Sequence, residues 1–154
     1  MGLPEIILRA HRSQVSRHGV EVIYRSQTAG EIELRALRKQ SFARQYETDG
    51  QFTLLVNEDW HVEAGLLVDG DGRRVTPQAG DAVLFVNAQG LVSWFEVLPW
   101  ANDPAARFAD TMRQIYEIHS KQTREFFAGQ LVAEDGSPLV AENGAFFISE
   151  AVAA

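Results

Sequence analysis

The sequence predicts a mainly β protein: a small antiparallel β-barrel or sandwich with a short N-terminal helix and a C-terminal β-meander extension. Two observations predict this class. Apolar and polar residues alternate with a period of two through several segments, which is the pattern of strands with one buried face. Turn-forming residues separate these segments about every ten residues, as they do in barrels and sandwiches. We expect three units, at residues 1–19, 20–124 and 125–154.

Residues 3–18 are expected to form the N-terminal helix. Pro4 suits a first turn, and the carboxylate of Glu5 suits the positive end of the helix dipole. Gly19 stands where a C-cap glycine belongs. The apolar stripe is weak, so we expect the helix to depend on docking. The stripe consists of Ile6 and Ala10 with Leu3 and Ile7.

The first hairpin is the strongest strand signal in the chain. Residues 20–25 and 32–36 both alternate in polarity, and residues 28–30 (Thr-Ala-Gly) supply a turn between them. Phe42 and Tyr46 belong to either a third strand or a loop. After a further turn at residues 49–50 (Asp-Gly), residues 52–56 are expected to form a strand.

A second hairpin is predicted at residues 77–98, where Pro77 and a Gly-Asp turn lead into an apolar strand, a polar break and an aromatic strand. Residues 99–110 are rich in turn formers and are expected to be irregular. Residues 112–118 fit a helix or a strand, and their Ile, Tyr and Thr content favours the strand. That strand would place Met112, Gln114, Tyr116 and Ile118 on one face.

The last thirty residues contain a short repeat. LVAEDG at 131–136 recurs as LVAENG at 139–144, and FISE at 147–150 resembles both. The Asp-Gly and Asn-Gly pairs are good turn dipeptides, so the repeat predicts short strands with tight turns. We expect either a small meander or a tail that orders against a partner.

Composition excludes several function classes. The 154 residues suffice for a buried core, and the absence of cysteine excludes disulfides, thiolate zinc sites and cysteine nucleophiles. A net charge of −7 argues against a general nucleic-acid binder. The charge is uneven: residues 1–50 carry 8 Lys/Arg against 6 Asp/Glu, whereas residues 125–154 carry none against 5. This asymmetry suits head-to-tail docking between copies, although ordinary solvated charge explains it equally well.

The sequence carries no sign of a membrane or export segment. No apolar run approaches the ~20 residues that span a bilayer. The N-terminus lacks the basic start and long apolar segment of a secretory signal. We expect a soluble protein made in the cytoplasm, with no membrane partner.

No motif predicts a metal or cofactor. His11 and His18 lack the close spacing and third ligand of a metal pair, so these histidines, with His61 and His119, are expected to be polar surface residues. The DGDG segment at 69–72 fails the EF-hand pattern, because a glycine occupies the twelfth position. It predicts a flexible turn.

No motif predicts catalysis either. The chain has no G-x-S-x-G, H-E-x-x-H or phosphate-binding glycine loop. Asp59, Glu96 and Asp110 could in principle form a carboxylate pair, but their spacing singles out none of them. We therefore expect a protein that is not an enzyme. Trp100, in the loop after Pro99, is either an exposed contact anchor or a side chain folded back onto the barrel.

The order of several segments resembles the head–tail joining proteins, or head-closure proteins of the neck, of tailed bacteriophages. Each segment is a weak motif by itself, and their order across residues 20–122 is moderately specific. Ser120, Glu117 and Phe95 depart from the residues that the family pattern has there. The segments are VIYR (22–25), NEDWHVEAGLLV (57–68), TPQAGDAVLF (76–85), WFEVLP (94–99) and RFADTMRQIYEIHSKQ (107–122).

The resemblance implies a virion protein that forms a sixfold or twelvefold ring between head and tail. It would contact its own copies, the portal or adaptor and tail proteins, and an acidic ring would let DNA pass without sticking. The alternatives are a tail-terminator ring, a small-ligand-binding β-barrel and a hydrolase with a carboxylate pair. Loops 69–77 and 99–110 would face partners. The expected contact residues are Asp69, Asp71, Arg73, Arg74, Trp100, Asp103, Arg107, His119 and Lys121.

Overall fold

The computed structural model describes residues 2–46, 48–100 and 102–127, with the backbone alone at residues 41–46 and 52–56. One helix, one short 3₁₀ helix and seven strands make up this part of the chain. They are α1 (Leu3–His18), β1 (Val20–Ser26), β2 (Gly30–Tyr46), β3 (Phe52–Glu63), η1 (Ala64–Leu66), β4 (Ala82–Val86), β5 (Leu91–Val97), β6 (Ala106–Phe108) and β7 (Ile115–Phe127).

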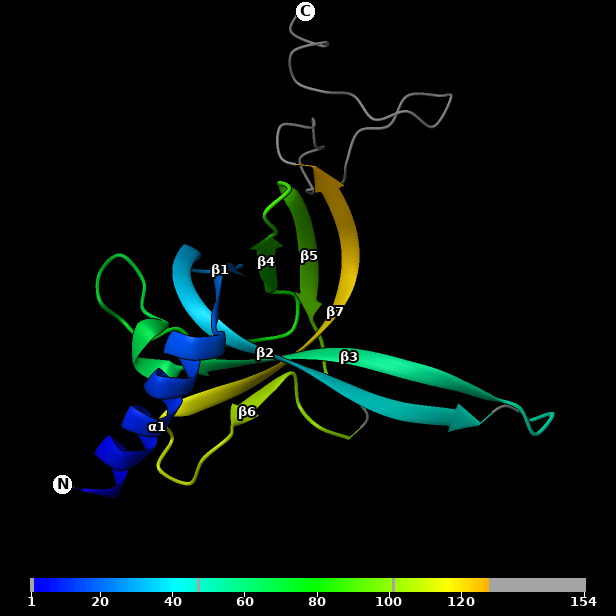
Figure 1. Ribbon diagram of the computed structural model, residues 1–154, viewed down its shortest axis with the longest axis horizontal. Coiled ribbons are helices and arrows are strands. Elements are labelled where there is room, and N and C mark those ends of the chain that lie inside the picture. Colours follow the sequence, from blue (N-terminus) through cyan, green and yellow to red (C-terminus); the bar gives the residue numbers. More distant parts are fainter. Residues whose placement is uncertain (1, 47, 101, 128–154) are drawn as a thin grey trace, which may run out of the picture.

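The strands form one antiparallel sheet that closes into a barrel (Figure 1). The strand order is β3-β2-β1-β4-β5-β7-β6, and an additional pairing of β3 with β7 joins the two sides. β6 lies outside the closed ring, on the edge of β7 that β5 occupies further along. The predicted choice between barrel and sandwich is thus decided in favour of a barrel, because β3 and β7 meet.

The barrel interior is filled by side chains. Inward-facing residues of every barrel strand form one cluster, and its largest members, Trp60, Tyr24 and Phe95, are at most 1% exposed. The rings of Trp60 and Phe95 meet edge to face with centroids 5.3 Å apart. Alternation along β1 and β2 sends Val22 and Leu34 into this cluster and the residues between them outward, as the period of two predicts.

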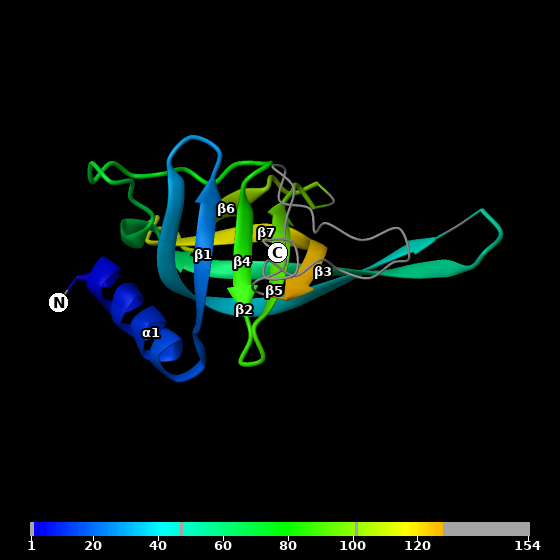
Figure 2. The same cartoon turned by 90° about the horizontal axis from the view of Figure 1, so that it is seen from above.

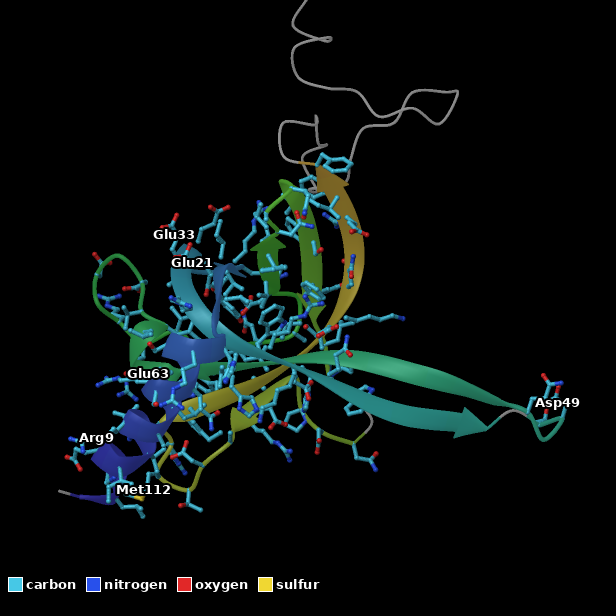
Figure 3. The ribbon with its side chains drawn as sticks, viewed as in Figure 1. Arg9, Glu21, Glu33, Asp49, Glu63 and Met112 are labelled. Atoms are coloured by element: carbon cyan, nitrogen blue, oxygen red, sulfur yellow. The ribbon has the colours of Figure 1, made fainter. Side chains whose placement is uncertain are left out.

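Strands β2 and β3 continue beyond the barrel as a long two-stranded arm (Figures 1 and 2). Residues 30–36 of β2 pair with β1, and residues 37–46 pair with β3. Among the residues that the structure describes, 42–46 and 52–56 pair with each other and with no other strand. Asp49 lies at the tip (Figure 3). The sequence predicted a strand at 52–56 and left 42–46 open between strand and loop; the arm's length was not foreseen.

Helix α1 has the predicted bounds, but it docks by a different face. Leu3 and Ile6 of the expected stripe are 54% and 50% exposed, whereas His11 is buried. Arg12 forms a bidentate ion pair with Glu63 of β3, which fixes the helix against the barrel end. Of the expected stripe only Ile7 is half-buried, while its other three members are exposed. The ion pair and the buried histidine orient the helix, and neither belongs to an apolar pattern.

Gly19 ends α1 for a reason other than a left-handed cap. Its φ is −69°, in the extended region, and its N–H donates to the carbonyl of Val15. A Cβ at this position would lie 2.4 Å from that carbonyl oxygen. Glycine is therefore required by the close approach of the backbone.

Both predicted hairpins are present, and two other expectations need correction. Residues 99–110 are not wholly irregular, since 106–108 form β6 on the edge of β7. The strand expected from residue 112 begins at Ile115, because Arg113 has φ 57° in a turn that Asp110 holds by accepting backbone N–H groups. The repeat at 131–150, and with it the C-terminal meander, lies outside the described residues.

Candidate partner-contact sites

The pairing of β3 with β7 places a set of polar side chains at the seam where the barrel closes. The register sets Glu58 opposite Ser120 and Asp59 opposite His119. The indole N–H of Trp60 donates to the hydroxyl of Ser120 at 2.9 Å, and that hydroxyl donates to the carbonyl of Glu58 at 2.8 Å. All these residues are buried, so the hydrogen bonds fix the register of the closing pair.

His119 lies at the centre of a polar cluster beside this seam. We call Asp59, Asp103, Arg107, Glu117 and His119 the His119 cluster. The Nδ1 atom of His119 lies 2.7 Å from the Oδ1 atom of Asp59, whereas its Nε2 atom has no hydrogen-bond partner in the part of the chain that the structure describes. His119 is 2% exposed. The prediction that the histidines are polar surface residues is wrong for His119 and also for His11, because tertiary contacts bury both rings.

Charged side chains cover the outer side of this cluster. Arg107 of β6 donates to Glu117 of β7 at 3.1 Å and lies 3.6 Å from Asp103. His61 of β3 contacts the other oxygen of Glu117 at 3.3 Å. Burial lowers the pKa of His61, and Lys39 lowers it further against the opposing effect of Glu117. A neutral His61 that donates its Nε2–H to Glu117 fits this arrangement.

Trp100 is partly folded back onto the barrel. It pairs with Asp103 in an isolated β-bridge, and its ring centroid lies 6.0 Å from that of His119. The structure thus brings together four of the residues proposed from sequence as partner contacts. They are Trp100, Asp103, Arg107 and His119, and of these Arg107 and Asp103 expose 49% and 43% of their side chains.

The other proposed contacts lie elsewhere. The DGDG turn is held from within, because the Oδ1 atom of Asp69 accepts the N–H groups of Asp71 and Arg73 at 2.9 Å each. Gly72 takes φ +79° in this turn. The side chains of Asp71, Arg73 and Arg74 are exposed. Lys121 is exposed on β7 in register with Glu96 of β5, so it belongs to the outer wall of the barrel.

Asp81, in the Gly-Asp turn before β4, is a buried anchor that the sequence did not single out as such. It is 0% exposed and accepts the hydroxyl proton of Tyr24 on β1. It also accepts the backbone N–H groups of Gln27 at 3.0 Å and Gln78 at 3.1 Å. Burial, followed by the hydrogen bond to Asp81, raises the pKa of Tyr24 far above its usual range. One carboxylate therefore ties together β1, the first turn and the turn before β4.

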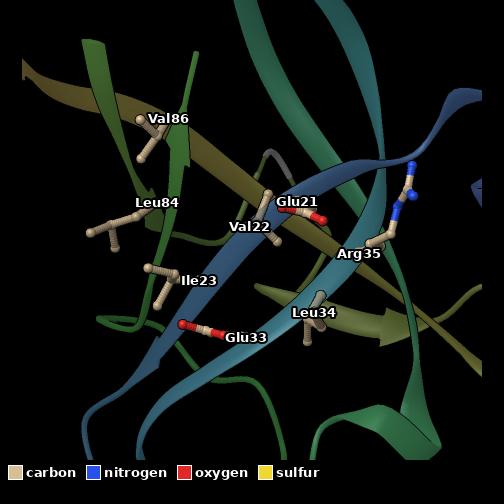
Figure 4. A pocket seen from close by; sticks show the side chains of 8 residues that line it. All are labelled: Glu21, Val22, Ile23, Glu33, Leu34, Arg35, Leu84 and Val86. Carbon is tan, nitrogen blue, oxygen red and sulfur yellow. The ribbon is translucent and has the colours of Figure 1, made fainter. Parts of the chain in front are cut away.

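A surface hollow of about 450 Å³ lies on the outer wall formed by β1, β2 and β4 (Figure 4). Glu21 and Glu33 flank its apolar floor. Both side chains point away from the barrel (Figure 3). Sequence alternation indicated the outward positions but not the concavity, which depends on how three strands curve. The residues that line it are Glu21, Val22, Ile23, Glu33, Leu34, Arg35, Leu84 and Val86.

A filled barrel, a projecting arm and exposed charged loops define a protein that works through its surface. The sequence matches the family model of phage head-tail joining protein over residues 1–126, so the chain belongs to that family. Its role is accordingly to join phage head and tail, which implies contact with head and tail proteins in the virion. A comparison with curated proteins found no significant match. Among the described residues, no helix has the length and apolar content that crossing a bilayer requires.

The motifs that carried the family resemblance meet in space. Tyr24 of the Y-R strand bonds to Asp81 of the P-x-x-G-D turn. Asp59 and the neighbouring Trp60 bond to His119 and Ser120 of the closing strand. These residues therefore stabilise the barrel.

Proposed function

We propose that copies of this protein form a closed ring in the neck, around the channel through which DNA passes, and that each copy reaches its neighbour with the β2–β3 arm. The observation that carries this proposal is the arm itself. Residues 42–46 and 52–56 extend beyond the barrel with no third strand beside them among the described residues. An isolated two-stranded hairpin is marginally stable in water, so packing against another molecule would stabilise it.

Further surfaces are suited to neighbouring chains. Leu3 and Ile6 expose apolar side chains on the outer face of α1, one turn apart. Closed rings use heterologous contacts, in which a projecting element of one copy meets a different surface of the next. The loop with Asp71 and Arg73 and the loop with Trp100 and Arg107 are proposed to contact portal, adaptor or tail proteins. Of the other contact residues proposed from sequence, Asp69 and Arg74 belong to the first of these loops and the half-exposed Asp103 to the second. His119 is buried, and Lys121 lies on the barrel wall.

The charge of the chain suits a DNA channel. Seven excess negative charges per copy, repeated around a ring, repel phosphate and oppose adhesion of passing DNA. The proposed role is structural and requires no reactive group. Side chains fill the barrel interior, which gives the alternative of a small-ligand barrel no support from the described core.

The arm can be tested by removing it. Residues 42–56 would be replaced by an Asn-Gly turn, so that residues 41 and 57, which pair in the full chain, flank a tight hairpin. The full chain, alone and with its portal protein, is expected to form rings visible by mass photometry and negative-stain electron microscopy. The armless variant should stay monomeric with the same β-sheet circular dichroism.

A matched control lengthens the β4–β5 turn at residues 87–90 by two glycines and should still form rings. The proposal fails if the full chain remains monomeric at micromolar concentration even with portal present. It fails equally if the armless variant forms the same rings as the full chain.

A further inference from the structure

The Nε2 atom of His119 is a buried polar atom without a hydrogen-bond partner among the described residues. Asp59 already accepts a hydrogen bond from the amide of Asn57 at 2.8 Å, so its Oδ1 atom is an acceptor toward His119 as well. Nδ1 of His119 must therefore carry the proton in that 2.7 Å contact. The Nε2 atom then presents its lone pair inside the protein, and no described residue donates a hydrogen bond to it. A buried nitrogen left in this state costs free energy unless a cation or a proton satisfies it.

Two carboxylate oxygens lie close to that nitrogen, slightly farther from it than ligands of one metal ion lie from each other. The Nε2 atom lies 3.7 Å from Oδ2 of Asp103 and 3.8 Å from Oε1 of Glu117. Both contacts are too long for hydrogen bonds. Zinc ligands at ~2.0–2.2 Å from the metal in a tetrahedron lie roughly 3.3–3.6 Å from one another, so each of these two oxygens is a few tenths of an ångström farther from Nε2 than a fellow zinc ligand would be.

The charge of the His119 cluster points the same way. The carboxylates of Asp103 and Glu117, the two that lie nearest to Nε2, both contact the guanidinium of Arg107, at 3.6 Å and 3.1 Å. Two carboxylates that share one guanidinium leave a negative charge that a divalent cation would offset. Ligand atoms of Asp59, Glu117 and His119 lie within 4.8 Å of one another, which places Glu117 close to the imidazole that Asp59 orients.

We propose that His119 Nε2, Asp103 and Glu117 bind one Zn²⁺ ion, with water as the fourth ligand and Asp59 orienting the ring through Nδ1–H. A carboxylate behind the ligating histidine is the usual support for a zinc-bound imidazole. An imidazole ligand favours zinc over calcium or magnesium, which prefer oxygen alone. Asp103, 43% exposed, provides the route by which the ion enters.

The ion would fasten the loop that carries Trp100 and Asp103 to the closing strand β7. This loop holds candidate contacts to neighbouring virion proteins, so zinc would order a binding surface without taking part in any reaction. The inference does not depend on ring formation, because all proposed ligands belong to one chain. No sequence motif predicts this site, because its ligands come from a loop and a strand and do not have the spacing of a zinc-binding motif.

The test uses the full chain after EDTA treatment and dialysis. Isothermal titration calorimetry measures the binding of ZnCl₂, and thermal unfolding is measured with and without ZnCl₂. One equivalent should bind per chain and raise the melting temperature. His119→Asn keeps a donor for Asp59 but lacks Nε2, and Asp103→Asn alters a half-exposed ligand at little risk to folding. Each should weaken zinc binding at least tenfold. His18→Asn, on the exposed face of α1, is the matched control and should bind as the full chain does.

Nitrogen NMR of the His119 ring separates the two cations that could satisfy Nε2. With zinc, one ring nitrogen should be protonated and the other metal-bound; an imidazolium would show two protonated nitrogens. The proposal is overturned if ZnCl₂ does not bind stoichiometrically. It is overturned also if His119→Asn and Asp103→Asn bind zinc as tightly as the control.

Discussion

Asp81 is expected to be among the most sensitive positions in the barrel, and Asp81→Ala tests this directly. The substitution removes the acceptor of the Tyr24 hydroxyl and of the N–H groups of Gln27 and Gln78. A buried group left unsatisfied costs about 1–3 kcal/mol. For the Tyr24 hydroxyl we expect a cost at the upper end of this range, because Tyr24 is 1% exposed. Gln27 and Gln78 are exposed residues whose N–H groups can turn to water, so each falls at the lower end.

The sum predicts that Asp81→Ala lowers the free energy of unfolding by about 3–5 kcal/mol. At about 2–4 °C per kcal/mol for a chain of this size, the melting temperature should fall by roughly 6–20 °C. Tyr24→Phe should cost less, about 1–3 kcal/mol, because Asp81 keeps its two backbone donors. The double variant should cost less than the sum of the two single variants by about 1–3 kcal/mol, the coupling of the shared hydrogen bond.

Urea unfolding followed by tryptophan fluorescence, at concentrations where the protein is monomeric, measures all four proteins of this cycle. A control such as Gln89→Ala, in the exposed β4–β5 turn, should change the free energy of unfolding by less than about 0.5 kcal/mol. The reasoning is refuted if Asp81→Ala costs less than about 1 kcal/mol. It is refuted also if the two substitutions prove additive, since the hydrogen bond would then contribute nothing of its own.

Three further predictions concern the barrel seam and the helix. Ser120→Ala removes the acceptor of the Trp60 indole N–H and should lower the free energy of unfolding, measured in urea, by about 2–3 kcal/mol. A loss smaller than the experimental error would show that this hydrogen bond does not stabilise the pairing of β3 with β7. Gly19→Ala places a methyl group 2.4 Å from the Val15 carbonyl oxygen and should lower the melting temperature measurably, whereas an unchanged melt would show that the backbone relaxes freely. Burial lowers the pKa of His11, so the folded state resists a proton that the unfolded chain accepts near its ordinary pKa of about 6.5. The free energy of unfolding should therefore be highest above that pH and decline below it. His11→Gln should make this decline shallower, by less than the one-proton limit of about 1.4 kcal/mol per pH unit. Unfolding measured at several pH values tests this, and equal slopes for the two proteins would argue against a buried neutral ring.

Local chemistry explains why the hairpins could be predicted. The turn at 28–30 and the Gly-Asp turn at 80–81 act over a few residues, and the period of two in 20–25 and 32–36 already states which side chains face the core. Helix α1 likewise begins and ends where Pro4 and Gly19 predict. Its docking face did not follow, since the contact with Glu63 lies 51 residues away in sequence.

The length of the arm and the burial of His119 could not be predicted for the same reason. Whether a strand lies in the barrel or projects from it depends on which neighbour it finds, and β2 changes partner from β1 to β3 along its length. His119 has the polarity of a surface residue, and only the pairing of β3 with β7 brings Asp59 against its ring.

The sequence by itself determined the elements: a helix, two hairpins, a closing strand and an acidic surface, each encoded by spacing within a few residues. The tertiary structure alone decided how the elements meet. It joined β3 to β7, turned Asp81 and His119 inward and left the arm outside. The physical reason is that turn and strand preferences act between neighbours in the chain, whereas closure and burial depend on groups as far apart as Glu58 and Ser120, which are separated by 62 residues.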